Sequence, residues 1–358
     1  MKMQANNSVR GFTLVELVVS MALGLVVMAS LASLFKTGLN SVMLVSQRAE
    51  AQQNMRAALD LMVKDISMAG AGIPSGGIQL PNGTGSSLSN FGCDQSGICH
   101  VPSFNYPNSN YMYGVIPGFN NGVEASAVVA AAPPPIIDDS ITVVYVDYGF
   151  PLAEYNITFP VPGDGTNITL AANPTYNPAP PLITSAGGIQ VGDLIMLSNS
   201  LGTAVGEVTG LTAGSIAFAD LDALNMNQNG AQYNNIKSIS NGANTTAYRL
   251  FAVTYYLNVP TNGQTPRLMR QVNGLTPVPV ADDIINIQFA FDTYNSNNGA
   301  LDANQPNPLG VGENPNLVQK INIVVMGQSI LNNGNKSQNM YLATSVSARN
   351  MAFRNRYQ

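Results

Sequence analysis

The sequence predicts an α+β protein, with one long N-terminal α-helix packed on a mainly antiparallel β-sheet domain. A charge-free segment at residues 17–35 is followed by residues 36–69, which contain no proline, so one helix can run through both. Beyond residue 70 the chain is rich in Gly, Pro and Asn. Strand-like segments recur there without a long helical pattern between them, which favours antiparallel pairing.

The helix begins with a distinctive motif at residues 10–16, Arg-Gly-Phe-Thr-Leu-Val-Glu. The nineteen uncharged residues that follow give about 28 Å of helix, just enough to cross a bilayer core. A secretory signal would be cut after this apolar segment, where 30–32 (Ser-Leu-Ala) is the nearest site. A plain membrane anchor has no use for Glu16, since a carboxylate at bilayer depth costs about 2.5–3.5 kcal/mol. The motif resembles a third class, the type IV prepilin signal.

This resemblance implies a type IV pilin-like fold and a defined maturation route. A prepilin peptidase would cut between Gly11 and Phe12, methylate the new amino terminus and leave the apolar helix in place. Glu16 would become the fifth mature residue, and its carboxylate would pair with the Phe12 amine of a neighbouring subunit. A buried carboxylate is tolerable once a cation compensates it.

The charged residues predict the orientation in the membrane and argue against nucleic acid as a partner. Lys2 and Arg10 precede the apolar segment, so the N-terminus is expected in the cytoplasm and the domain after residue 35 in the periplasm. The protein would first reside in the inner membrane and later in the pilus at the cell surface. The formal charge of −5 becomes −7 once the leader is lost. That balance argues against bulk electrostatic binding of nucleic acid.

The second half of the helix carries an apolar stripe. Met55, Leu59, Met62, Ile66 and Ala69 step by four and three, as one face of a helix does, and predict packing against a sheet. The charged residues of this half predict its solvated face; they are Arg48, Glu50, Arg56, Lys64 and Asp65.

Residues 75–135 form a Gly-, Asn-, Ser- and Pro-rich insert for which no regular structure is predicted. Cys93 and Cys99 lie in it and are the only two cysteines. In an oxidising periplasm this spacing predicts a disulfide that closes a small loop. The alternative is a metal site that also uses His100, but a fourth ligand is missing from the local sequence.

Eight segments after the insert are predicted to be strands. They are 141–146, 193–197, 204–209, 248–257, 267–271, 284–291, 318–326 and 341–348.

Several segments after the N-terminal motif resemble one group within the type IV pilin-like proteins. The helix end at 59–70, the strand at 192–197, the late segments 268–270 and 280–289, and the basic C-terminus at 345–356 are similar to those of PilW-type minor pilins. Members of that group act with other minor and major pilins on an inner-membrane assembly platform.

Catalytic chemistry is sparse in this sequence. A single histidine and the lack of a Gly-x-Ser-x-Gly turn leave little room for a hydrolase, and we expect neither an enzyme nor a resident cofactor. The acidic pairs 138–139 and 282–283 could be catalytic acids but are more typical of caps and turns. One weak calcium site remains, with oxygen ligands from Asp292, Asn295, Asn297 and Asp302; the alternative is a plain turn rich in Asn and Asp.

The sequence thus predicts four regions and a structural role. These are a leader at 1–11, a transmembrane and assembly helix at 12–35, the periplasmic half of the helix at 36–72, and a β-rich pilin domain at 73–358. The expected function is that of a minor pilin in pilus initiation and assembly. The alternatives are a pseudopilin of a type II secretion system and a pilus-tip adhesin that uses the insert for cell adhesion.

Overall fold

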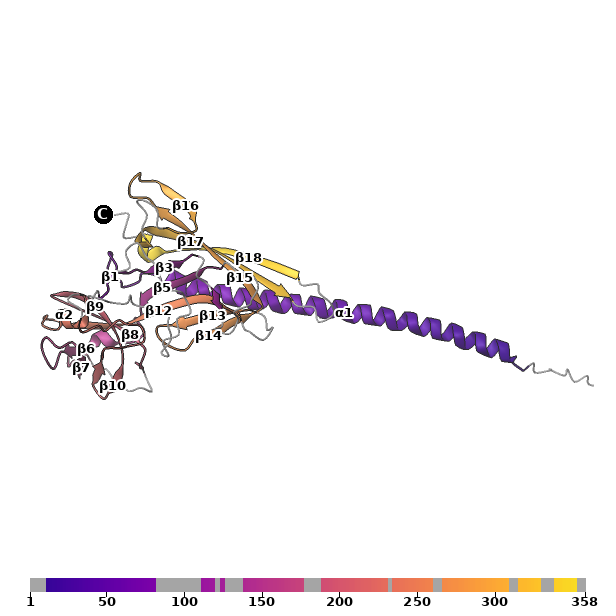
Figure 1. Ribbon diagram of the computed structural model, residues 1–358, viewed down its shortest axis with the longest axis horizontal. Helices are drawn as coiled ribbons and strands as arrows, with labels where there is room; N and C mark the ends of the chain where they lie inside the picture. The colour runs from indigo at the N-terminus through magenta and orange to yellow at the C-terminus, as the bar shows by residue number, and fades with distance from the viewer. Residues whose placement is uncertain are drawn as a thin grey trace, which may run out of the picture. The chain divides into compact units, whose positions relative to one another are not determined.

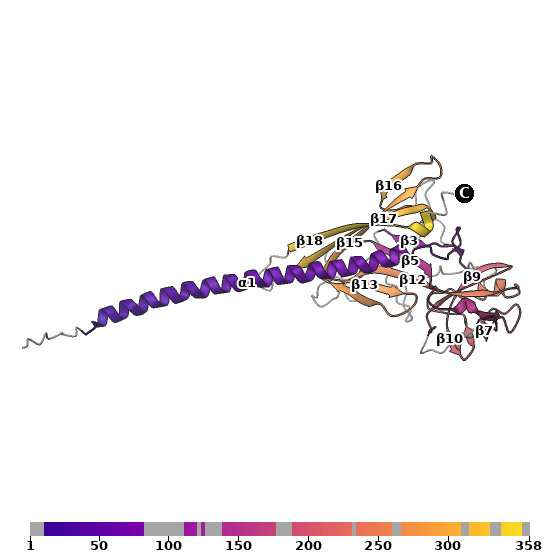
Figure 2. The same ribbon diagram turned by 180° about the vertical axis from the view of Figure 1, so that it is seen from behind.

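The computed structural model describes residues 11–81, 111–119, 123–125, 138–176, 188–230, 234–259, 266–308, 315–329 and 338–352. The chain forms two compact units. One comprises Met1–Glu50 with Ser329–Ser337, and the other comprises Ala51–Gln328 with Gln338–Gln358. A single helix, α1 (Leu14–Ser67, 54 residues), contributes to both units (Figures 1 and 2).

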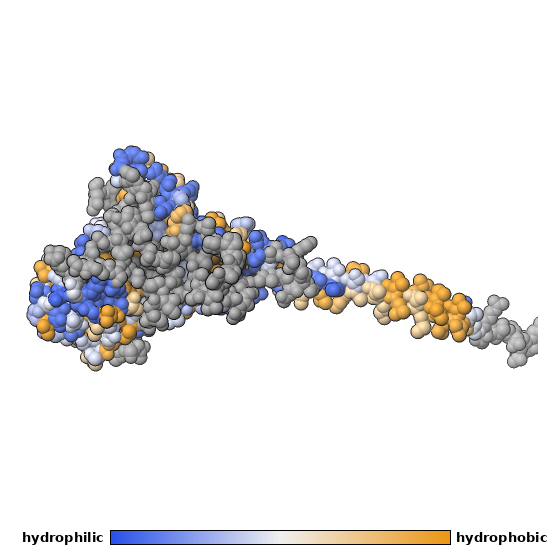
Figure 3. All heavy atoms as spheres, viewed as in Figure 1, coloured by the Kyte–Doolittle hydropathy of each residue, from blue (hydrophilic) through white to orange (hydrophobic). Residues whose placement is uncertain are grey.

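The first unit contains the N-terminal part of α1. The helix runs unbroken through Gly24 and Gly38, as the sequence predicts. Every residue from 11 to 43 is exposed. On the face shown in Figure 3, apolar side chains cover the N-terminal end of the described helix. A helix that is apolar on all sides is stable only when something other than water surrounds it.

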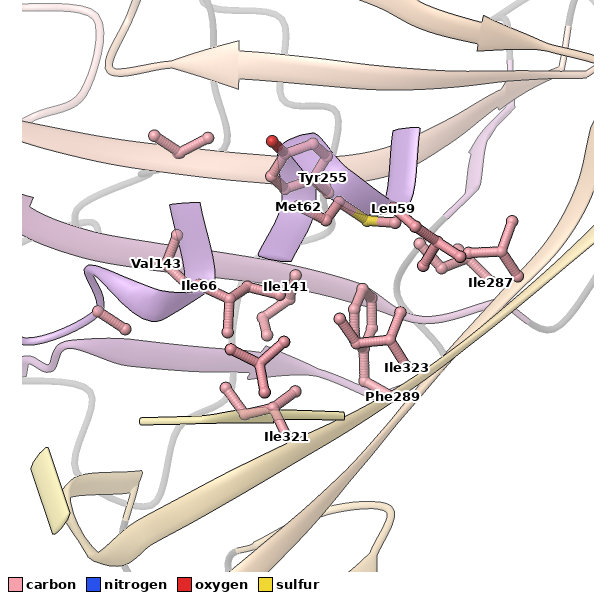
Figure 4. Close-up of a cluster of buried hydrophobic side chains, with 14 of the residues drawn as sticks. Leu59, Met62, Ile66, Ile141, Val143, Tyr255, Ile287, Phe289, Ile321 and Ile323 are labelled. Carbon is pink, nitrogen blue, oxygen red and sulfur yellow. The ribbon is translucent and has the colours of Figure 1, made fainter. Parts of the chain in front are cut away.

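The second unit begins with the last turns of α1, whose apolar stripe lies in its main core. Met55, Met62 and Ile66 have no exposed surface, and Leu59 and Ala69 are also buried. Figure 4 shows Leu59, Met62 and Ile66 facing side chains from two sheets, among them Ile141 and Phe289. The predicted stripe and its packing against sheet are therefore confirmed. Burial of each methionine, leucine or isoleucine side chain of the stripe stabilises the fold by about 1.5–3 kcal/mol.

The largest sheet has eight strands and is built around one long strand, β12 (Thr246–Val259). Its main order is β14 (Val278–Asp282), β13 (Arg267–Val272), β12, β5 (Ser140–Val146) and β3 (Val115–Gly118). β12 also pairs with β4 (Val123–Ala125) and β8 (Leu194–Asn199), and β8 pairs with β9 (Gly202–Glu207). Only the pairing of β4 with β12 is parallel among the described pairs.

Three smaller sheets complete the unit. One has the order β10 (Gly210–Thr212), β11 (Ser215–Ala217), β7 (Asn167–Ala172) and β6 (Tyr155–Thr158). Another has the order β16 (Leu301–Gln305), β15 (Ile284–Tyr294), β17 (Val318–Ser329) and β18 (Gln338–Ser347). β1 (Ile78–Gln79) pairs with β2 (Tyr111–Met112). The short helices are η1 (Leu152–Glu154), α2 (Ile236–Ile239), η2 (Pro315–Leu317) and α3 (Arg349–Ala352).

The chain leaves α1 through a glycine turn that attaches the helix to the large sheet. Gly70 has φ +77°, and a Cβ there would lie 2.7 Å from Met351 Cγ, so glycine is required. Gly70 N donates to Val144 O at 2.9 Å, and Val146 N donates to Ala71 O at 2.8 Å. Residues 70 and 71 thus bond to the end of β5 that extends beyond its pairing with β3.

All eight predicted strands are present, and the mainly antiparallel α+β class is confirmed. Six strands after the insert were missed, because they are short or carry few β-branched residues: β6, β7, β10, β11, β14 and β16. The absence of regular structure predicted for 75–135 is wrong for its described parts. Four short strands, β1 to β4, lie there, and β3 is fully buried against β5.

Candidate assembly site

The Gly11–Phe12 bond lies in an exposed, non-helical stretch just before α1. The Phe12 side chain is 88 % exposed, and a Cβ on Gly11 would meet no atom within 4 Å. Nothing in the described chain therefore shields the bond at which the sequence predicts cleavage.

Glu16 caps the helix that carries it. Thr13 N and Thr13 Oγ1 donate to Glu16 Oε2 at 3.0 and 2.9 Å, and Glu16 N donates to Thr13 Oγ1 at 3.3 Å. This reciprocal arrangement is a capping box, which stabilises the first helical turn. This capping box was not among the sequence predictions, although Thr-x-x-Glu before an apolar run is its signature. Thr13 follows the predicted cut, so processing would leave the cap intact.

The apolar surface behind Glu16 has no partner within the described chain. α1 is the one described helix long and apolar enough to span a membrane, and none of its most apolar 18-residue window is buried. Glu16 is the only charged residue between Phe12 and Phe35. The site therefore consists of an exposed bond at the predicted cut, one carboxylate and an exposed apolar helix.

Comparison with known proteins matches this part of the chain. Residues 6–32 match the family model described as the prokaryotic N-terminal methylation motif. The match supports a type IV pilin-like prepilin signal. Together with the apolar helix, it fits a single-pass membrane anchor. Searches of curated proteins and of solved structures gave no match.

A second cluster lies in the core of the other unit, around Asp65 of α1. Asp65 Oδ2 accepts from Tyr255 Oη at 2.5 Å and from Arg270 Nε at 2.8 Å, and Asp65 Oδ1 accepts from Tyr145 Oη at 3.1 Å. The Asp65 side chain is 5 % exposed and that of Arg270 21 %. The assignment of Asp65 to the solvated face is therefore wrong, whereas Arg48, Glu50, Arg56 and Lys64 are exposed as predicted.

Electrostatics in this cluster favour neutral phenols beside a charged pair. Burial, then the charge and hydrogen bond of Asp65, raises the pKa of Tyr145 and of Tyr255 above their ordinary value. For Arg270, burial lowers the pKa, but the hydrogen bond and charge of Asp65 outweigh it and the net shift is upward. Asp65 thus fixes the helix to β5, β12 and β13 at once.

The acidic pair 138–139 also joins elements. Asp138 Oδ1 accepts from Ile287 N and Asp139 Oδ2 accepts from Phe289 N, both at 2.9 Å. Both aspartates are buried and hold β15 beside the start of β5. Burial, and secondarily the neighbouring Asp139, raises the pKa of Asp138 to about 6 against the lowering effect of the Ile287 hydrogen bond.

The other acidic pair, 282–283, lies at the connection from β14 to β15. Asp283 has φ +61° and Asp282 forms an ion pair with Arg267 at 3.0 Å, so this pair occupies a turn, as expected.

Glu207 of β9 is a further buried acid, and it was not among the sequence predictions. Leu224 N donates to Glu207 Oε2 at 2.8 Å, and Asp222 beside it accepts from Met226 N and Asn227 N at 2.7 and 3.0 Å. Burial, then the neighbouring Asp222, raises the pKa of Glu207 to about 8. The β10–β11 hairpin lies between these two acids in the chain, and its fold brings them together.

The structure divides the four calcium candidates into two groups. Asp292 Oδ1 accepts from Asn304 N and Asn322 Nδ2, and Asp292 Oδ2 pairs with Lys320 at 3.4 Å. In the loop itself, Asn295 Nδ2 donates to Asp302 Oδ2 at 2.8 Å, and Asn297 N donates to Asn295 Oδ1 at 3.0 Å.

These bonds correspond to the plain turn, and calcium binding stays a prediction that nothing in the geometry favours. Among the described residues, no three His, Cys, Asp or Glu side chains are placed to hold a metal ion. Cys93, Cys99 and His100 lie outside the described residues, so the disulfide stays a prediction as well.

Proposed function

We propose that this chain is a minor pilin, a structural subunit that acts in the initiation and assembly of a type IV pilus. The observation that carries the proposal is the prepilin signal, in which Glu16 lies in the first turn of an exposed apolar helix. Its partners are the prepilin peptidase, the inner-membrane assembly platform and other minor and major pilins. The domain faces the periplasm before assembly and the cell surface afterwards, and the protein performs no catalytic turnover.

The capping box explains how Glu16 can serve two roles. Its Oε2 caps the helix, while its Oε1 has no hydrogen bond to any described residue. Cleavage after Gly11 would create an ammonium group at Phe12, the one cation that processing supplies at this depth. A neighbour's Phe12 amine would then pair with the free oxygen. An uncompensated carboxylate in the bilayer is costly, so this pairing draws subunits together.

Two substitutions of Glu16 separate charge from shape. Glu16→Leu removes the carboxylate, and Glu16→Gln keeps a helix-capping oxygen without the charge. We expect both variants to be cleaved and to stay in the inner membrane, yet to lose co-purification with pilus subunits after crosslinking. Thr13→Val is the matched control, because it removes the cap partner's hydroxyl and leaves the Glu16 charge in place. Recovery of partners by Glu16→Leu at the wild-type level would refute the assembly role of this residue.

The nearest alternative is a pseudopilin of a type II secretion system, which would use the same signal and helix. Deletion of the gene distinguishes the two: loss of surface pili supports the pilin, whereas loss of protein secretion with normal piliation supports the pseudopilin. An adhesin at the pilus tip would instead keep piliation and lose surface attachment when the insert at 75–135 is shortened.

A further inference from the structure

A hollow of about 590 Å³ opens on the β-rich unit, where the segment after α1 meets the large sheet. Its walls come from residues 72–75, from β5 and from the ends of β8, β9 and β12. This volume is within the roughly 300–1,000 Å³ of small-molecule sites. None of its described lining residues is charged. A charged ligand would therefore find no counter-charge among these described lining residues.

The floor of the hollow consists of two parallel rows of side chains. Thr203, Ser198 and Thr246 are directly opposite one another on β9, β8 and β12, and form a row of three hydroxyls. Two residues further along the same strands, Met196 is opposite Tyr248 and forms an apolar row beside the first. Residues two apart on a strand point to the same face, so both rows face the hollow.

The hydroxyl row keeps hydrogen-bonding capacity for a ligand. Ser198 Oγ and Thr203 Oγ1 are 3.1 Å apart, and Thr246 Oγ1 donates to Ser198 O at 3.2 Å. A hydroxyl has one donor and two acceptor lone pairs, so acceptor sites remain on all three groups. Ser198 and Thr203 are half-buried and Thr246 is exposed, which makes these sites accessible.

Two tyrosines add aromatic surface. Tyr248 is half-buried in the floor, whereas Tyr148 is 66 % exposed at the rim. Tyr148 Oη reaches over the helix exit, since it lies 2.5 Å from where a Cβ on Gly72 would stand. Because Gly72 has no Cβ, it leaves room for this hydroxyl, and its φ of +73° also favours glycine. The hollow thus has an exposed aromatic ring at its rim and three hydroxyls in its floor.

We propose that this hollow binds a neutral carbohydrate. A sugar ring has an apolar face, which aromatic and methionine side chains accept, and a polar edge of hydroxyls, which the Thr203–Ser198–Thr246 row accepts. Cross-strand hydroxyl pairs can also have a purely structural role. Thr158 Oγ1 and Thr169 Oγ1, 2.6 Å apart on another sheet, are such a pair. What distinguishes the row in the hollow is that it lies beside Met196 and that Tyr148 lines the same hollow. This binding site is independent of the assembly role proposed for Glu16.

The test uses the full chain in a detergent without a sugar head group. An array of neutral glycans identifies binders, and calorimetric titration with maltotriose and chitotriose measures affinity. Sialyllactose serves as the charged comparator. We expect saturable binding of at least one neutral glycan and no binding of sialyllactose.

Matched variants assign the binding to the hollow. Tyr148→Ala is compared with Tyr341→Ala, because both side chains are 66 % exposed and Tyr341 lies on β18, outside the hollow. Ser198→Ala is compared with Thr158→Val. We expect Tyr148→Ala and Ser198→Ala to weaken binding about three- to tenfold, as lost ring contacts or hydrogen bonds of about 0.5–1.5 kcal/mol imply, and the controls to bind normally.

Three results would overturn the proposal. One is no binding across the neutral array. Another is equal or better binding of sialyllactose. The third is an affinity that changes equally in the paired variants. Circular dichroism of each variant ensures that any loss reflects the site rather than unfolding.

Discussion

Replacing Asp65 should destabilise the β-rich unit more than any other charged substitution on α1. The carboxylate accepts hydrogen bonds from Tyr145, Tyr255 and Arg270 while almost fully buried. Asp65→Ala leaves the Arg270 charge and two phenols without that acceptor. Breaking one partner of a buried ion pair costs about 3–5 kcal/mol. Arg270 keeps 21 % of its side chain exposed, which permits partial solvation, so the lower end of about 3 kcal/mol is expected.

Asp65→Asn keeps the shape and one acceptor oxygen and removes the charge. Hydrogen bonds to a charged group contribute about 1.5–3 kcal/mol, so we expect a loss of about 2 kcal/mol. Asp60→Ala is the control, because Asp60 is exposed on the same helix and should change stability by less than about 0.5 kcal/mol. The double variant Asp65→Leu with Arg270→Met should recover part of the loss, since two apolar residues leave no unpaired charge.

The assay is urea unfolding of the detergent-solubilised full chain. The chain has no tryptophan, so near-ultraviolet circular dichroism reports its tyrosines, including the two that bind Asp65. The free energy of unfolding is compared between variants at one detergent concentration. Equal unfolding midpoints for Asp65→Ala and Asp60→Ala would refute the idea that Asp65 holds the helix to the sheet.

Three further predictions concern pH, processing and the insert. Folding raises the pKa of Glu207 from 4.5 to about 8, so the folded state holds this proton more tightly; its contribution to stability is full below about pH 4.5 and is lost as pH rises to about 8. The free energy of unfolding should therefore fall by up to about 5 kcal/mol over this range, and in Glu207→Gln the smaller fall that remains should level off above pH 6, once the pH has passed the folded-state pKa of Asp138. Gly11→Val should block leader removal and accumulate unprocessed protein; a normal mature mass would refute cleavage between Gly11 and residue 12. Cys93 and Cys99 should resist thiol labelling in protein purified without reductant, and reduction should leave the unfolding midpoint nearly unchanged because the loop is short; labelling of both cysteines would contradict the bridge.

The sequence by itself determined the features that depend only on residues close together in the chain. The prepilin motif, the uncharged span and the stripe Met55, Leu59, Met62 and Ile66 depend on neighbouring residues and on the helical period, so α1 and its buried face could be predicted. The longer strands were also readable, because a β-branched run such as 141–146 favours extended backbone wherever it packs.

Only the tertiary structure decided which distant groups meet. Asp65 lies at the rim of its stripe, and a charge there looks solvated until β5, β12 and β13 bring Tyr145, Tyr255 and Arg270 to it from as far as 205 residues away. The short strands of the insert and the hydroxyl row of the hollow arise in the same way. Their stability comes from pairing with segments remote in sequence, and a local pattern carries no information about which remote segment that is.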